Sequence, residues 1–329
     1  MLKKQIFFFY NPVKLIVLAF IILSGCRANE TKITSSATTL NKLLCNGIER
    51  SYRLYIPEGY NNTKFVPLLI VLHGGLGNAE IMEKLTCKEF NRLADKYTFI
   101  VVYPNGIGRH WNDGRTQVKY KPHREKIDDV AFIATLIENL KKSYNIDTTR
   151  VYATGISNGA FMCFRLAIEL SDRIAAIAPV AASLIVEYQN KAPSRPVPLL
   201  IINGVDDPFV PWNGGSIRGG LFGQRIIGTV LSTPDTVKKW SEYNICQSNP
   251  QIIHIPDLEP DDGCSVDLKV YSGEKKSSEV ILYEIKGGGH TWPGGWQYLP
   301  KSFVGKTCRD INACEIIWEF FSRHQLLKD

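Results

Sequence analysis

The chemistry of this 329-residue chain begins at Ser157, which lies between two glycines in the stretch GISNG at 155–159. A β-branched run precedes this stretch and a helical pattern follows it. In that context GxSxG predicts a tight strand-to-helix turn, with glycines where side chains would collide with neighbouring backbone. The turn lifts the serine hydroxyl clear of the sheet at a helix N-terminus, whose dipole favours developing negative charge. The alternative is a glycine-rich turn whose serine only caps the helix.

A nucleophilic serine needs a base, and the base needs an acid that orients it. In strand-turn-helix sites of this kind, the acid and then the histidine follow the nucleophile along the chain, each after a later strand. His290 follows an apolar run, in the loop GGGHTW, and is the predicted base. Asp206 and Asp207 follow another run, and because they are adjacent we expect their side chains to point in different directions, with Asp207 as the acid. Asp128 and Asp129 precede the serine and indicate a helix cap.

Backbone N–H groups are the expected donors to an oxyanion formed by such a serine. One comes from Asn158, next to the nucleophile. The other comes from the glycine-rich loop HGGLG at 73–77, where Gly75 is favoured over Leu76. His73 precedes the nucleophile and is expected to brace this loop. These steps require no metal or organic cofactor, and no pair of cysteines has zinc-finger spacing.

Apolar runs alternate with helical patterns along the chain, and several runs are apolar on both faces, as buried parallel strands are. The predicted strands are 53–57, 67–73, 98–104, 150–155, 174–182, 198–204 and 279–285, and the predicted helices are 79–96, 128–144, 158–170, 234–244 and 312–324. This alternation predicts an α/β fold with a mostly parallel central sheet covered by helices on both faces. Ligands collect beyond the carboxyl ends of such strands, where Ser157, Asp207 and His290 are expected.

The first 25 residues have the pattern of a bacterial export signal, with early lysines and an apolar stretch too short to span a bilayer. The stretch ends in LSGC at 23–26, which resembles the lipobox of lipoproteins. We therefore expect Cys26 to be lipidated and to anchor an exported protein at a membrane. Residues 26–46 are the expected tether, and 47–329 a single catalytic domain. The alternative is an uncleaved signal anchor.

Charge and cysteine content limit the partners and the compartment. The formal charge of +7 falls to +4 when the three lysines of the signal are removed, which is too weak to indicate nucleic-acid binding. Loss of Cys26 leaves seven of the eight cysteines, so at least one is unpaired, and Cys163 within a helical pattern is the expected one. An exported chain favours at least one disulfide among the others. Nearness in sequence weakly favours Cys246 with Cys264 and Cys308 with Cys314.

Six stretches together resemble a known family, the secreted polyhydroxybutyrate depolymerase and feruloyl esterase group of α/β-hydrolases. They are VLHGGLGNA, FIVVYPNG, DDVAFIATLI, RVYATGISNGAFMCFRLA, VDDPFVP and GGGHTWPGG. The resemblance spans most of 47–325 and implies Ser157 as nucleophile, Asp207 as acid and His290 as base of an esterase. Asn203 departs from the histidine that the family often has before Gly204. No adhesive second domain follows the last helix, which weakens the case for solid polymer as the substrate.

The substrate is less well specified by the sequence than the reaction. Loops 105–126 and 208–233 are expected to wall the site, and Trp111, Trp212 and Trp292 are the expected substrate contacts, with packing as the alternative for each. The basic stretch at 115–126 is expected to be a solvated loop. Short hydroxyalkanoate esters and feruloyl or acetyl esters of polysaccharides are both compatible. The alternatives are a serine peptidase of the same fold and a non-catalytic surface lipoprotein.

Overall fold

The computed structural model describes residues 8–9, 16–17, 37–219, 224–273 and 278–327. The chain divides into two compact units, Met1–Ser35 and Ser36–Asp329. In the first, β1 (Phe8–Phe9) and β2 (Ile16–Val17) pair antiparallel. Cys26 and most of the predicted signal lie outside the described residues. Within the described ranges, no helix is long and apolar enough to cross a bilayer.

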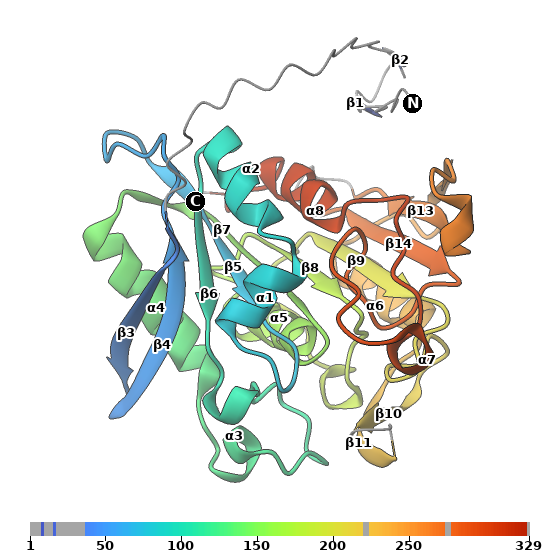
Figure 1. The fold of residues 1–329 in the computed structure, drawn as a ribbon, viewed down its shortest axis with the longest axis horizontal. Helices are drawn as coiled ribbons and strands as arrows, with labels where there is room; N and C mark the ends of the chain where they lie inside the picture. Colours follow the sequence, from blue (N-terminus) through green and yellow to red (C-terminus); the bar gives the residue numbers. More distant parts are fainter. Residues whose placement is uncertain (1–7, 10–15, 18–36, 220–223, 274–277, 328–329) are drawn as a thin grey trace. The chain divides into compact units, whose positions relative to one another are not determined.

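A ten-stranded sheet forms the centre of the second unit, in the order β12-β13-β14-β9-β8-β7-β5-β6-β4-β3 (Figure 1). Its middle is parallel and is formed by β5 (Val66–Leu72), β6 (Ile100–Pro104), β7 (Ile146–Ile156), β8 (Ala176–Val180), β9 (Leu199–Gly204) and β14 (Val280–Lys286). Antiparallel pairs extend both edges, β3 (Thr39–Cys45) with β4 (Ile48–Tyr55), and β12 (Gln251–Ile255) with β13 (Ser265–Tyr271). Every residue of β5, β6, β8 and β9 is buried, as strands covered on both faces must be.

Helices cover both faces of the sheet, and the alternation of side chains along β5 separates the two layers (Figure 1). Leu68 and Ile70 pack in one core with α4 (Asp129–Ser143), α5 (Asn158–Glu169) and α6 (Thr233–Tyr243). Leu69 and Val71 pack in a second core with α1 (Ala79–Leu85), α2 (Glu89–Tyr97) and α8 (Ala313–Ser322). The predicted fold class, an α/β-hydrolase sheet with helices on both faces, is confirmed.

Four local features differ from the expectation. Residues Thr39–Cys45, expected to belong to the tether, form the edge strand β3 and pair along their whole length with β4. The helix expected over 79–96 is two helices, because Cys87 and Lys88 adopt left-handed conformations at φ 52 and 57°. Strands β12 and β13 were not predicted. The expected loop 208–233 contains a hairpin of β10 (Gly215–Gly219) and β11 (Arg225–Val230).

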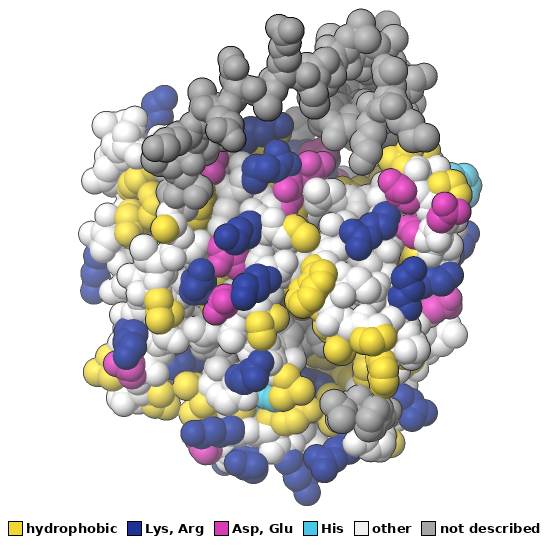
Figure 2. All heavy atoms as spheres, in the orientation of Figure 1, with side chains coloured by type: hydrophobic (Ala, Val, Ile, Leu, Met, Phe, Trp, Pro, Cys, Tyr) yellow, Lys and Arg dark blue, Asp and Glu magenta, His cyan; other side chains and the backbone are white. Residues whose placement is uncertain are grey.

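The basic stretch at 115–126 is only partly a solvated loop. It contains the short helix α3 (Lys121–Arg124), and four of its basic residues are exposed: Lys119, Lys121, Arg124 and Lys126. Its first residue, Arg115, is instead buried against Asp113, with a guanidinium-to-carboxylate distance of 2.6 Å. Figure 2 shows lysine and arginine side chains spread over one face among acidic and apolar ones. Such a mixed surface is ordinary for a globular domain.

Candidate active site

Ser157 occupies the turn between β7 and α5 in a strained backbone conformation, with φ 56° and ψ −118°. Its N–H donates to the carbonyl of Val180 at 3.0 Å, and its carbonyl accepts from the N–H of Phe161 at 2.9 Å. The side chain makes no capping hydrogen bond to the helix. The hydroxyl is therefore not used as a helix cap, and the strained turn presents it beyond the end of the sheet.

The two flanking glycines are required by the close approach of β5. A Cβ atom at Gly155 would lie 2.6 Å from the carbonyl oxygen of Leu72, and one at Gly159 would lie 2.4 Å from the same atom. Both distances are far below van der Waals contact. The prediction that side chains at these positions would collide with neighbouring backbone is confirmed.

Asp207, rather than Asp206, contacts the predicted base. Its Oδ2 lies 2.7 Å from Nδ1 of His290, and its Oδ1 accepts from the N–H groups of Phe209 at 2.8 Å and Val210 at 2.9 Å. The Asp206 side chain is exposed. Because Nδ1–H donates to the carboxylate, Nε2 is the ring nitrogen left to accept a proton.

The loop that carries His290 is held from both sides. The His290 N–H donates to the carbonyl of Val304 at 2.6 Å, and its carbonyl accepts from the Tyr298 hydroxyl at 2.9 Å. On the side of Asp207, a Cβ at Gly204 would lie 2.3 Å from the carbonyl oxygen of Gly288, so glycine allows the two loops to touch. His290 as a whole is 6% exposed. Within the described residues no hydrogen bond joins it to Ser157, which is common before substrate binds.

The loop after β5 lies beside Ser157. Of its two candidate oxyanion donors, the N–H groups of Gly75 and Leu76, one already has an acceptor. A Cβ at Gly74 would lie 3.6 Å from Cβ of Ser157, and one at Gly75 would lie 3.9 Å from Cβ of Asn158. The Leu76 N–H already donates to the carbonyl of Arg109 at 2.9 Å. Among the described residues no acceptor is found for the Gly75 N–H, so Gly75 is the better oxyanion donor of the pair.

His73 braces this loop, as expected, and is not placed as a base. Its Nδ1 donates to the carbonyl of Gly74 at 2.7 Å, and its Nε2 accepts from the N–H of Gly106 at 3.0 Å. The ring is fully buried, and this burial lowers its pKa to about 4. A neutral His73 thus ties the loop after β5 to the loop after β6.

A buried polar network fixes Asn158, and it was not predicted. The Asn158 amide accepts from the N–H of Trp111 at 2.8 Å and donates to the carboxylate of Asp113 at 2.5 Å. The Asp113 carboxylate also accepts hydrogen bonds from the side chains of Arg115 and His123. Burial by itself raises the pKa of Asp113, but Arg115 and His123 hold it well below its usual range. Only the cluster of Asn112, Asp113 and Arg115 in this loop could have signalled the network, and their contacts across the fold are not visible in the sequence.

The tryptophans do not all lie where substrate could reach them. Trp111 and Trp292 are fully buried, so neither presents surface to a substrate, contrary to the expectation. Trp111 donates Nε1 to the carbonyl of His73 at 2.9 Å, and Trp292 packs edge-on against Phe90 at 6.0 Å. Trp212 is half-buried. Phe209, not anticipated, packs edge-on against the His290 ring at 5.3 Å.

The two loops expected to wall the site touch each other. Arg115 donates to the carbonyl of Ile227 in β11 at 3.0 Å, and Arg218 in β10 donates its N–H to the carbonyl of Phe209 at 2.8 Å. The hairpin therefore connects the buried Asp113 network with the segment beside His290.

Comparison with known proteins agrees with this geometry. Residues 50–192 match the family model described as Esterase PHB depolymerase. The chain is 29% identical over 299 residues to the putative esterase NocK of Nocardia uniformis subsp. tsuyamanensis, an alignment that covers 88% of this chain and 83% of that protein. It is 31% identical over 253 residues to feruloyl esterase B of Piromyces equi, covering 74% of this chain and 43% of the relative. It is also 27% identical over 286 residues to poly(3-hydroxyalkanoate) depolymerase C of Paucimonas lemoignei, covering 81% and 65%.

Residues 50–192 thus match the Esterase PHB depolymerase family, and the comparisons support a carboxylic ester hydrolase. The alignments cover less than half of feruloyl esterase B and 65% of the depolymerase. The substrates that these two names give are therefore stated for those relatives and not for this esterase. Among solved structures, the acetyl xylan esterase from Aspergillus awamori matches with a TM-score of 0.56 at 14% identity. That match covers 87% of the esterase and 99% of the other chain and shows the shared fold.

Proposed function

We propose that this esterase is an exported serine hydrolase that cleaves carboxylic esters through an acyl-enzyme. The observation that carries the proposal is the 2.7 Å contact between Asp207 and His290, at the end of the sheet where Ser157 stands in a strained turn. A buried carboxylate on Nδ1 leaves Nε2 unprotonated and oriented as a general base. A serine that only capped a helix would not need the strained turn, and a histidine that only packed in the core would not need a carboxylate on Nδ1.

The reaction follows from these groups. The Ser157 hydroxyl attacks the ester carbonyl carbon while Nε2 of His290 takes its proton. The N–H groups of Asn158 and Gly75 stabilise the oxyanion. The intermediate collapses, and His290 returns the proton to the departing alcohol. Water, deprotonated by the same nitrogen, then attacks the acyl-enzyme and releases the acid and the free serine.

The substrate class is an ester of a hydroxyalkanoate or a feruloyl or acetyl ester of a polysaccharide. Phe209 beside His290 and the half-buried Trp212 offer aromatic surface that suits either class. Turnover of p-nitrophenyl acetate, methyl ferulate and 3-hydroxybutyrate oligomers, measured in parallel, separates the two. A fluorophosphonate probe should label wild type and fail to label Ser157→Ala. Labelling of the folded variant would overturn the serine mechanism.

The second part of the proposal is export and anchoring through Cys26. It is supported by the lysines, the short apolar stretch and the LSGC sequence at 23–26. Replacement of Cys26 by alanine should move the protein from the membrane fraction to the soluble exported fraction. A Cys26→Ala protein whose signal is cleaved but which stays in the membrane fraction would contradict the anchor.

A further inference from the structure

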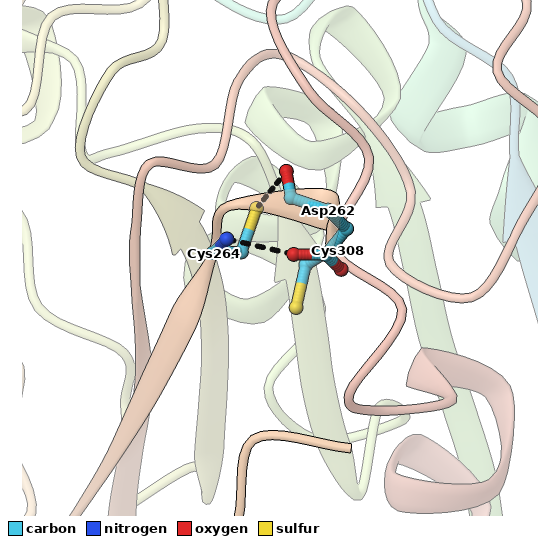
Figure 3. A group of neighbouring side chains, drawn as sticks. All are labelled: Asp262, Cys264 and Cys308. Carbon is cyan, nitrogen blue, oxygen red and sulfur yellow. Dashed lines mark hydrogen bonds between the residues drawn. The ribbon is translucent and has the colours of Figure 1, made fainter. Parts of the chain in front are cut away.

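Two buried cysteines far apart in sequence meet at the edge of the sheet that carries the histidine loop. Cys264 immediately precedes β13, and Cys308 follows the short helix α7 (Lys301–Val304). Their sulfur atoms and a carboxylate oxygen of Asp262 all lie within 4.8 Å of one another (Figure 3). Cys264 and Cys308 are 5% and 1% exposed. Nearness in sequence weakly favoured the pairs Cys246 with Cys264 and Cys308 with Cys314. The structure instead brings Cys264 and Cys308 together.

Asp262 brings the two cysteine segments together. Its Oδ1 accepts from the N–H of Cys264 at 2.7 Å (Figure 3). Its Oδ2 accepts from the N–H of Arg309 at 2.5 Å. Both oxygens of this carboxylate are thus engaged by backbone from the two segments. Lys306 adds a positive charge at the rim, where its Nζ donates to the carbonyl of Gly263 at 3.2 Å. These contacts favour a bond between the sulfurs over a bound metal cation.

We propose that Cys264 and Cys308 form a disulfide in the exported protein, and that this bond positions the loop of His290. Bond formation requires the sulfurs, which lie within 4.8 Å of each other, to close to about 2.05 Å. The chain between the two cysteines contains β13, β14 and His290, so the bond closes a covalent ring around the base.

The segment that carries Cys308 is the backing of the histidine loop. Gly289 donates its N–H to the carbonyl of Lys306 at 2.9 Å, and Gly294 donates to the carbonyl of Cys308 itself at 2.9 Å. The His290 N–H donates to the same segment at Val304. A bond from Cys308 to the start of β13 therefore fixes the backbone against which the base is held. The effect on catalysis rests on the proposed function, whereas the bond itself does not.

The oxidation is a thiol–disulfide exchange. Each thiol loses one proton and one electron as the sulfur–sulfur bond forms, and the oxidant is a second disulfide, which takes up both electrons and both protons to become two thiols. Oxidised glutathione supplies this chemistry in vitro, and an oxidising compartment supplies it after export.

Peptide mapping tests the bond directly. Full-length protein equilibrated with oxidised glutathione, alkylated with iodoacetamide and digested without reductant should yield a peptide pair joined through Cys264 and Cys308. Cys163, buried in α5, should be found alkylated only after unfolding. Recovery of Cys264 and Cys308 as separate alkylated peptides would overturn the proposal. So would one equivalent of zinc that protects both thiols without a cross-link.

Variants test the positioning role. Cys264→Ser, Cys308→Ser and the double variant should each lower Tm by roughly 5 to 10 °C, and by the same amount, because all three lose one bond. The kcat for p-nitrophenyl acetate at 25 °C should fall roughly threefold to tenfold with KM unchanged, since the base and not the binding surface is displaced. Cys246→Ser, at the half-buried thiol that bonds to the carbonyl of Ser278, is the matched control and should change neither value.

The two proposals fail in different ways. A cross-linked peptide pair with unchanged kcat in the variants would overturn the positioning role and leave the esterase mechanism intact. Loss of the fluorophosphonate reaction in wild type would overturn the serine mechanism and leave the peptide map unaffected. Additive losses of Tm in the double variant would show that the two thiols act separately and would overturn the bond.

Discussion

The Asp207 carboxylate divides its oxygens between two tasks. Oδ1 accepts two backbone N–H groups of its own loop, and Oδ2 accepts the imidazole N–H. An amide in its place can satisfy only one of these, because its nitrogen would face either the backbone donors or the imidazole. The identity of one atom at this position therefore decides the tautomer of His290.

Asp207→Asn should lower kcat for p-nitrophenyl acetate by roughly 10³- to 10⁴-fold with the fold retained, because His290 is then held in the wrong tautomer. Asp206→Asn is the matched control and should cost tenfold or less, since its side chain is exposed. Circular dichroism checks that both variants fold. An inactive Asp206→Asn beside an active Asp207→Asn would move the acid by one residue.

His73 gives the protein a specific sensitivity to acid. The unfolded residue takes up a proton near pH 6.5, whereas burial holds the folded pKa at about 4. Between these values the unfolded state binds more protons, so stability is lost as the pH falls. This residue should therefore contribute a loss of about 2 kcal/mol in the free energy of unfolding between pH 7 and pH 5.

Urea unfolding of wild type and His73→Gln at the two pH values measures this loss. The variant is expected to be less stable at pH 7, because the two braced loops lose a contact, but its further loss at pH 5 should be about 2 kcal/mol smaller than in wild type. Equal losses in both proteins would show that His73 is not the acid-sensitive group. Other titrating residues cancel in this comparison.

At the scale of elements, one buried ion pair joins an edge strand to a helix and a site loop. Arg50 in β4 lies 2.6 Å from Oδ1 of Asp129, the first residue of α4, and both side chains are buried. The other oxygen, Oδ2, accepts from the N–H of Asn112 at 2.7 Å. Asp128 caps the same helix through the N–H of Ala131, as the sequence predicted. The first residue of α4 thus binds both β4, through Arg50, and the loop after β6, through Asn112.

Asp129→Asn should lower the free energy of unfolding by about 3 to 5 kcal/mol, because the Arg50 charge is left buried without its partner. Glu49→Gln, which breaks the exposed pair with Lys42, is the matched control and should cost less than about 1 kcal/mol. Urea titration at pH 7 measures both. Similar values for the two variants would mean that the buried pair is no stronger than a surface one.

The sequence predicted the elements whose burial leaves a pattern and missed those that depend on contacts across the fold. The parallel strands appear as apolar runs because both faces are covered, and the turn at Ser157 was predicted because its glycines are sterically required. Strand β3 is half polar and follows a Thr/Ser-rich stretch, so it resembled a tether. The Asp113 network joins residues that meet only after the loop folds onto α5.

At the scale of the whole molecule, the catalytic unit begins before the predicted boundary at residue 47. A chain that starts at Ser36 keeps β3, whereas a chain that starts at Gly47 exposes the edge of β4 and the core contacts of Leu43 and Cys45. The shorter chain should be less stable by about 3 kcal/mol or more. Thermal unfolding of the two truncations measures the difference. Equal unfolding midpoints would mean that residues 39–45 belong to the tether and not to the catalytic domain.

The parallel pairing of β14 with β9 joins the strand before the predicted base to the centre of the sheet. The nucleophile turn and the oxyanion loop are complete once β5, β7 and β8 have met, but the base arrives only with the strand nearest the end of the chain. Long-range parallel pairing is slow. We therefore expect the proposed site to lack its base until β14 has docked beside β9, and ester hydrolysis to begin only then. We expect recovery of turnover after dilution from urea to lag behind the fluorescence change of Trp111 and Trp240, the buried tryptophans that precede β14 in the chain.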